Sequence, residues 1–239
     1  MKKRIGLIVT LVMATALLFG FCACGDQDEA AGGVDDGMLS AAELTADDWD
    51  GLMWQAADKQ AQKEYQKYVP ETAFANAEVF GIDKDRDKGT AYVWLDTREY
   101  VAFKDNAYCM TGSAGEAILK FTYGEDKATL DEIVWSADGG EHDAWLKDNF
   151  PAEYLEKQAA YDAYNEDGTN KMEEVFAQQV EAEMGVPVAE ADFLLEIDAD
   201  TGAYELTKVS ETGEGEDYEF NTEVVEKGKL KKLEDGASE

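Results

Sequence analysis

Between Ala77 and Ser136 the chain consists of short runs of β-branched and aromatic residues, and this stretch most constrains the fold. Clusters of turn-forming residues separate the runs. Because short connections favour antiparallel neighbours, the pattern predicts a meander of about five strands joined by hairpins. The expected strands are Glu78–Ile82, Ala91–Leu95, Tyr100–Phe103, Ala117–Tyr123 and Leu130–Trp135, and the expected turns are Asp83–Gly89, Lys104–Asn106, Thr111–Gly115 and Gly124–Lys127.

Apolar residues at helical spacing precede and follow this region. Thr45 and Asp48 approximate a capping box, and the helical period continues until Pro70, which predicts one helix of about six turns. The later helices are expected at His142–Phe150, Ala152–Tyr164 and Lys171–Met184.

The C-terminal part is typical of strand–turn–strand structure. The expected hairpin pairs Phe193–Ile197 with Ala203–Val209, and a weaker pair follows around Tyr218–Val225 and Leu230–Leu233. The sequence therefore predicts an α+β fold: an antiparallel meander flanked by an N-terminal helix and later helices, with a C-terminal β-hairpin.

The N-terminus has the features of a secretory signal: a basic start at Met1–Arg4, an uncharged stretch at Ile5–Ala23 and a small residue before the cleavage point. Phe21-Cys22-Ala23-Cys24-Gly25 resembles the lipobox of bacterial lipoproteins, in which a small residue precedes an invariant cysteine. The resemblance implies that Cys24 carries the acyl chains (palmitate among them) that anchor a Gram-positive lipoprotein to the outer face of the cell membrane.

Two alternatives to lipidation stay open. An uncleaved transmembrane anchor is one, because the stretch Ile5–Ala23 nearly reaches the roughly 20 apolar residues that span a bilayer. Ordinary cleavage and release is the other, although no A-x-A site follows the apolar run. The expected organisation is a signal peptide at 1–23, an acidic flexible tether at 24–43, a globular α+β domain at 44–187, a C-terminal β-hairpin region at 188–233 and a tail at 234–239.

The charge balance limits the partners. The chain has 21 basic and 53 acidic residues, a net charge of −32. Loss of Lys2, Lys3 and Arg4 with the leader would leave 18 basic residues and a net charge of −35. Such a surface repels nucleic acid and anionic headgroups, so we expect contact with the membrane only through the lipid anchor. A basic protein or peptide is the expected kind of partner.

Two further resemblances concern the folded part. From Thr90 to Pro151 the order of features is similar to an extracytoplasmic domain of antirepressor-type sensor metallopeptidases of Gram-positive bacteria. The matching segments include Tyr92-Val93-Trp94-Leu95, Glu99-Tyr100 and Thr111-Gly112-Ser113-Ala114-Gly115, then Ala117–Tyr123, Leu130–Trp135 and Lys147–Pro151. Glu196–Tyr204 resembles the closing hairpin of a PepSY-type repeat, a secreted module often proposed to inhibit proteases.

Catalytic and cofactor motifs are missing from the sequence. It contains no H-E-x-x-H, no S-x-x-K and no phosphate-binding glycine loop, so neither peptidase chemistry nor a cofactor is expected. His142 is expected on the surface at a helix start. Cys109 lies in an apolar run, where cysteine usually behaves as a small buried hydrophobe.

Two features are candidate binding residues. Asp83, Asp85 and Asp87 alternate as in calcium loops and are a candidate site for a hard cation, although Lys88 and Trp94 occupy the positions where an EF-hand needs glycine and glutamate. The second candidate is Trp54, which breaks the apolar stripe of its helix and could stack on a sugar ring. By contrast, Trp49, Trp94 and Trp135 fit periodic apolar patterns and are expected in the core.

These observations predict a lipid-anchored extracytoplasmic module that binds or senses an unidentified ligand or a basic protein partner and is not an enzyme. The alternative is a carboxylate-dependent hydrolase that acts on envelope polysaccharide, because Trp54 could hold a sugar and carboxylates are plentiful.

Overall fold

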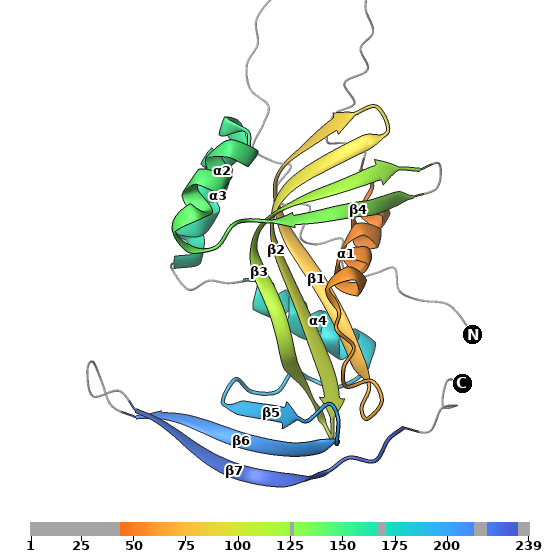
Figure 1. The fold of residues 1–239 in the computed structure, drawn as a ribbon, viewed down its shortest axis with the longest axis vertical. Coiled ribbons are helices and arrows are strands. Elements are labelled where there is room, and N and C mark those ends of the chain that lie inside the picture. Colours follow the sequence, from red (N-terminus) through yellow and green to blue (C-terminus); the bar gives the residue numbers. More distant parts are fainter. Residues whose placement is uncertain (1–43, 125–126, 167–170, 213–218, 234–239) are drawn as a thin grey trace, which may run out of the picture.

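The computed structural model describes residues 44–124, 127–166, 171–212 and 219–233, which form two antiparallel sheets and four α-helices (Figure 1). The first sheet has the order β1-β2-β3-β4, and its strands are β1 (Glu71–Asp85), β2 (Lys88–Phe103), β3 (Asn106–Tyr123) and β4 (Ala128–Trp135). The second has the order β5-β6-β7, and its strands are β5 (Phe193–Ile197), β6 (Ala203–Thr212) and β7 (Glu219–Lys229).

The helices cover the first sheet. They are α1 (Ala46–Gln60), α2 (His142–Asn149), α3 (Ala152–Glu166) and α4 (Lys171–Met184), and a 3₁₀ turn (Gly139–Glu141) precedes α2. The predicted α+β class is confirmed, and the three helices expected after Gly140 are present within two residues of their expected ends.

The prediction of five meander strands is wrong in its details. The expected strands Ala91–Leu95 and Tyr100–Phe103 are parts of one strand, β2, so the sheet has four strands. The expected turn at Thr111–Gly115 is also wrong, because these small residues lie inside β3 and pair with Leu95–Glu99. The polar residues at the centre of β2 resemble a turn in the sequence, but the strand continues through them.

The C-terminal hairpin is part of a larger unit. Phe193–Ile197 and the following strand pair as expected, and β7 adds a third strand antiparallel to β6. The expected strand at Leu230–Leu233 is not one, because β7 ends at Lys229. The result is a three-stranded sheet in place of a two-stranded hairpin.

Helix α1 begins as predicted but is shorter than six turns. The Thr45 side chain accepts a hydrogen bond from the Asp48 backbone, and Asp48 Oδ2 accepts one from the Thr45 backbone, which completes the capping box. The helix ends at Gln60, well before Pro70. After it, Lys63 has φ 55°, a left-handed conformation that ends helical geometry.

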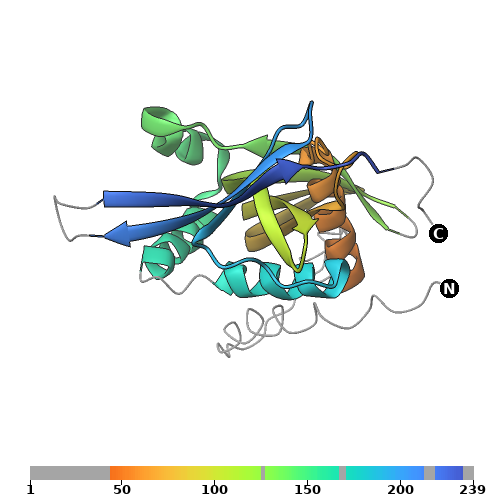
Figure 2. The ribbon, with the colours of Figure 1, turned by 90° about the horizontal axis from the view of Figure 1, so that it is seen from below.

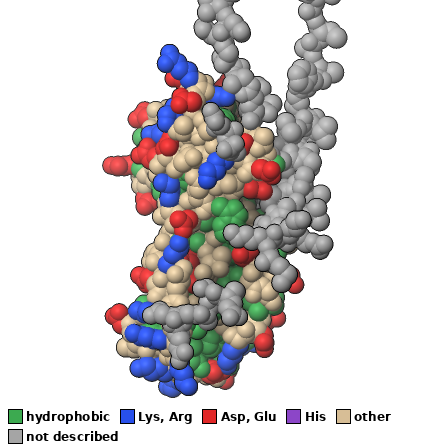
Figure 3. Space-filling view, turned by 90° about the vertical axis from the view of Figure 1, so that its right-hand side faces the viewer, with side chains coloured by type: hydrophobic (Ala, Val, Ile, Leu, Met, Phe, Trp, Pro, Cys, Tyr) green, Lys and Arg blue, Asp and Glu red, His purple; other side chains and the backbone are tan. Residues whose placement is uncertain are grey.

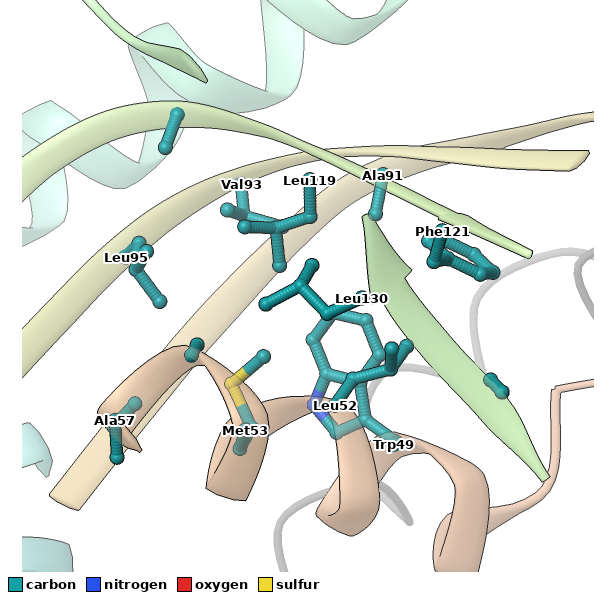
Figure 4. Packing of buried hydrophobic residues seen from close by; sticks show 14 residues of the cluster. Trp49, Leu52, Met53, Ala57, Ala91, Val93, Leu95, Leu119, Phe121 and Leu130 are labelled. Carbon is teal, nitrogen blue, oxygen red and sulfur yellow. The ribbon is translucent and has the colours of Figure 1, made fainter. Parts of the chain in front are cut away.

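The main hydrophobic core lies between α1 and one face of the first sheet. Trp49, Leu52 and Met53 are buried on the inner side of the helix. Figure 4 shows these side chains with those of the facing strands, among them Val93, Leu95, Leu119, Phe121 and Leu130. Alternation along β2 explains the packing, since Ala91, Val93 and Leu95 all point to this face.

The opposite face of the sheet receives the other helices. The part around Phe80 and Ile118, which is uppermost in Figure 1, packs against α2 and α3. The part around Phe74 and Tyr100, further down, packs against α4. The second sheet crosses the lower end of the first (Figure 2). Its buried residues Leu195, Ile197 and Leu206 share a cluster with Val101, Phe103 and Tyr108.

Strand β2 takes part in all four hydrophobic clusters of the described residues. Val93 belongs to the α1 core, Val101 to the cluster with the second sheet and Tyr100 to the cluster with α4. Tyr92 and Trp94 pack against the cluster with α2 and α3. This strand is therefore the common structural element of the fold.

Candidate functional site

The residues singled out from the sequence do not form one site. Cys24, the expected lipid anchor, lies outside the described residues.

Trp54 is 47% exposed on the outer side of α1, and its ring centroid is 6.3 Å from that of Phe74. Hydrophobic side chains reach the surface at mid-height on the side of the molecule where α1 lies (Figure 3). The other tryptophans expected in the core are buried or partly buried there.

The aspartate run lies at the tip of the β1–β2 hairpin. Asp85 pairs with Lys88, and Arg86 between them has φ 58°. Asp83 accepts a hydrogen bond from the Tyr154 hydroxyl at 2.8 Å, so its carboxylate contacts helix α3. Within the described ranges no group of three or more His, Cys, Asp or Glu side chains could hold a metal ion, and these aspartates therefore do not form such a group.

An open hollow of about 510 Å³ lies on the β5–β6–β7 sheet. Acidic side chains predominate over the one lysine in its lining, which comprises Glu196, Ile197, Asp198, Ala203, Tyr204, Glu205, Lys227 and Gly228. We call this hollow the acidic groove.

One aspartate of the acidic groove is committed to the turn between β5 and β6. Asp198 Oδ1 accepts hydrogen bonds of 2.9 Å from the backbone N–H groups of Asp200 and Thr201. These bonds hold the pKa of Asp198 below its usual value. The turn closes at Gly202, whose φ of +72° suits glycine and whose Cα faces the ring of Tyr68. Glu196 and Glu205 are therefore the carboxylates that the groove offers to a ligand.

Glu196, Glu205 and Lys227 form a row across the three strands. Glu196 lies directly opposite Glu205, and Glu205 lies opposite Lys227. The row faces outward, because the adjacent residues Leu195, Ile197 and Leu206 are buried on the other face. Two like charges in directly opposed positions destabilise a sheet, and a cation bound there would relieve the repulsion.

A second acidic feature is buried where the loop after α1 meets the first sheet. Glu99 is 3% exposed, and its two oxygens accept hydrogen bonds from the backbone N–H groups of Gln62 and Lys63, at 3.1 and 2.8 Å. Glu71 Oε2 accepts one from the Tyr65 N–H at 2.8 Å. The loop is thus folded around two glutamate side chains, which explains why α1 stops at Gln60.

The surroundings of Glu71 change its acidity. Burial and the neighbouring Glu99 carboxylate raise the pKa of Glu71 from 4.5 to about 7. Among the described residues no donor reaches the buried Oε1 of Glu71. A carboxyl group whose pKa is raised toward neutrality is a feature of acid–base catalysis. However, the hollow beside Glu99 has a volume of only about 70 Å³, far below the size of a ligand pocket.

A third buried carboxylate connects β3 with the α2–α3 region. Glu116 is 3% exposed and lies 2.9 Å from His142 Nε2, and it accepts a hydrogen bond from Gln158 at 2.8 Å. His142 was expected on the surface, yet its side chain is only 31% exposed and contacts this buried group. The bond to Glu116 raises the pKa of His142.

The expectation for Cys109 is also corrected. Cys109 was expected to be buried, but it is exposed on β3, next to the buried Tyr108. Its sulfur lies 3.6 Å from the Thr111 carbonyl oxygen.

Sequence reasoning missed Glu99 and Glu116, although a signal for both exists. In strand alternation Glu99 falls on the same face as Val93, Leu95 and Val101, and Glu116 falls on the same face as Ile118. A carboxylate at a core-facing position indicates a specific partner, because an unpaired buried charge is very costly. The separation of Glu71 from Glu99 in the sequence hid their proximity.

None of the described helices has the length and apolar character needed to cross a membrane. Comparisons with protein-family models, with curated proteins and with solved structures found no match for this chain.

Proposed function

We propose that the protein is a lipid-anchored extracytoplasmic module that binds or senses a basic protein or peptide and does not act as an enzyme. The anchor rests on the lipobox-like sequence at Cys24, with a signal peptide before it and an acidic tether after it. Acyl chains at Cys24 would hold the folded part at the outer face of the membrane.

The acidic groove is the observation that supports a binding role. Its outward carboxylates, Glu196 and Glu205, stand opposite each other on the open surface of the second sheet. The overall net charge of −32 reinforces the attraction for a basic partner. Long-range charge steers association, and the local pair of glutamates provides the contact.

The alternative is a carboxylate-dependent hydrolase of envelope polysaccharide. The observation in its favour is the Glu71–Glu99 pair, in which the pKa of one member is raised to about 7. Against it, the carboxylate of Glu99 is occupied by two backbone N–H groups, and the adjoining hollow is too small for a sugar ring. Trp54 lies on α1 and is not part of the lining of this hollow. We therefore place the alternative second.

Two experiments test the proposal. Cells that express the protein are labelled with a radioactive fatty acid, and label is expected in the wild type but not in Cys24→Ala. Label in the variant would refute the anchor. The protein is then used to capture partners from envelope extracts at low and moderate salt. Recovery of a basic partner is expected, with weaker recovery at higher salt. No recovery at either salt concentration would remove the support for a binding module.

The hydrolase alternative is tested with purified cell wall. We expect no release of reducing ends by the wild type. Release that Glu71→Gln abolishes would establish the alternative in place of the binding role.

A further inference from the structure

Three of the five large hydrophobic side chains that are exposed in the described residues lie on the second sheet. Leu194 is 53%, Val224 is 48% and Val225 is 53% exposed. Leu194 lies opposite Thr207, and Thr207 lies opposite Val224, so Leu194, Thr207 and Val224 form one row across the strands, whereas Val225 lies at the bulge. Cross-strand neighbours on one face have Cβ atoms about 4.5–5.5 Å apart, so this row is a continuous strip. We call it the apolar row.

The apolar row and the row of Glu196, Glu205 and Lys227 belong to the same face of the sheet. Leu194 and Glu196 are two residues apart on β5, and Glu205 and Thr207 are two residues apart on β6, so their side chains point the same way. The opposite face is filled by Leu195, Ile197 and Leu206. The outward face thus carries two exposed aliphatic side chains, Leu194 and Val224, in the row beside a pair of opposed glutamates.

Each row contains an unfavourable feature. Glu196 and Glu205 repel each other, although Lys227 faces Glu205 from its other side, and exposed aliphatic groups gain nothing from contact with water. A ligand that supplies a cation to the first row and an apolar group to the second would relieve both costs. We propose that the outward face of the β5–β6–β7 sheet binds a segment of another protein in which lysine or arginine side chains stand next to aliphatic ones. This inference rests on the proposed binding function and adds the surface and the chemistry of the partner.

Charge distinguishes this partner from the other possible occupants of the face. A second copy docked face to face would bring Glu196 and Glu205 of both molecules together, which is repulsive. Pairing along the free edge of β7 is discouraged by Lys227, by Lys229 and by the bulge at Val225, since charged side chains and bulges both protect edges. A membrane surface rich in anionic lipids would repel the glutamates.

The test uses the full-length protein in nanodiscs of zwitterionic lipid, with empty nanodiscs as the blank. The probe is a fluorescent peptide that alternates lysine and leucine, and binding is measured by anisotropy. Two comparison peptides separate the contributions: lysine alternating with serine keeps the charge, and glutamate alternating with leucine keeps the apolar groups. The lysine–leucine peptide is expected to bind at least about tenfold more tightly than either comparison peptide.

Three variants map the binding surface. Glu196→Gln with Glu205→Gln removes the acidic pair, and Leu194→Ser with Val224→Ser removes the apolar row. Each is expected to weaken binding of the lysine–leucine peptide about tenfold. The matched control is Glu181→Gln with Glu183→Gln on α4, which removes two exposed carboxylates that are not part of the sheet and is expected to leave the affinity unchanged. Thermal unfolding checks that all variants fold, which is expected because the four positions on the sheet face outward.

Several outcomes would overturn the inference. Equal weakening by the α4 control would mean that the peptide responds only to net charge. Equal binding of the lysine–serine peptide would remove the role of the apolar row, and no binding of the lysine–leucine peptide would remove the site. Sedimentation that shows a dimer abolished by Leu194→Ser with Val224→Ser would assign the face to a second copy.

The failure of this inference can be told apart from failure of the proposed function. If a partner captured from envelope extracts binds the wild type and both sheet variants equally, the protein is a binding module that uses another surface. If no partner is captured while the lysine–leucine peptide binds the sheet, the sheet face binds basic and aliphatic side chains as inferred. The experiment on envelope extracts then counts against the proposed function as a binding module.

Discussion

His142 Nε2 lies 2.9 Å from Oε2 of Glu116, so the first residue of α2 contacts a carboxylate that is buried on β3. The other oxygen of Glu116 accepts a hydrogen bond from Gln158 of α3. One buried acid therefore attaches two consecutive helices to the sheet. His142 Nδ1 also lies 3.7 Å from Asp143, so the imidazole faces carboxylates on both sides.

This contact predicts a stability that depends on pH. Because the bond to Glu116 raises the pKa of His142 above 6.5, the folded state holds the proton more tightly than the unfolded chain. The contribution is complete below pH 6.5 and is lost as the pH rises through the raised pKa. We expect His142→Gln to reduce the free energy of unfolding by about 1 kcal/mol at acidic pH and by less at alkaline pH, as measured by urea unfolding. A reduction that stays constant with pH would contradict this.

The raised pKa of Glu71 predicts a second dependence of stability on pH. The folded state keeps the proton of Glu71 up to about pH 7, whereas the unfolded chain loses it near 4.5, so stability decreases as the pH rises between these values. Glu71→Gln mimics the protonated form. We expect it to increase the free energy of unfolding on the order of 2 kcal/mol at pH 8 and to change it little at pH 4.5.

The control for Glu71 is Glu99→Gln. Its amide nitrogen would replace one of the two accepting oxygens and face the backbone N–H of Gln62 or Lys63, so about 1–3 kcal/mol of stability should be lost at pH 4.5. The loss should be smaller at pH 8, because the substitution also removes the repulsion between the two carboxylates. A decrease in the free energy of unfolding for Glu71→Gln at pH 8 would contradict the raised pKa of Glu71.

Arg98 connects α4 to the sheet through a guanidinium that lies between two carboxylates. It donates to the buried Asp96 at 2.8 Å and to Glu173 at 2.7 Å, and it covers the Phe176 ring at 4.4 Å. Lysine cannot make these parallel bonds, so Arg98→Lys is expected to cost about 2 kcal/mol in thermal or urea unfolding. Glu173→Gln, which changes the exposed partner, is expected to cost less than about 1 kcal/mol. Equal costs would show that the buried Asp96 does not depend on the guanidinium.

Helix α3 packs on β1 through a contact between Tyr154 and Gly81. A Cβ atom at this position would lie 2.1 Å from the Tyr154 ring, so the aromatic ring packs directly on the glycine backbone. Gly81→Ala is expected to destabilise by about 2 kcal/mol, and less when Tyr154→Leu is also present. The matched control is Gly51→Ala in the middle of α1, where no atom lies within 4 Å and a stabilisation of about 0.5–1 kcal/mol is expected. An additive double variant would contradict the contact.

The α+β class and most helix positions could be predicted from the sequence because they depend on local signals. The capping box at Thr45, the period of the later helices and the hairpin turn at Lys104–Asp105 need only neighbouring residues. The hairpin between β5 and β6 was found for the same reason, since the aspartates and the glycine between Asp198 and Gly202 are a local turn signal.

The length of β2 could not be predicted in the same way. Asp96–Glu99 is a polar run, which usually ends a strand, yet Asp96 bonds to Arg98 and Glu99 bonds to a loop far away in the sequence. The end of α1 depends on the same distant acid. The outward face of the second sheet was missed because it requires the third strand, β7, whose register places Val224 and Lys227 beside residues of β6.

The membership of β2 in every hydrophobic cluster has a consequence for how the molecule opens. No helix and no part of the second sheet can separate without uncovering this strand on at least one side. We expect local fluctuations that free single elements to leave its amide protons protected. The slowest hydrogen exchange among the described residues is therefore expected at the centre of β2.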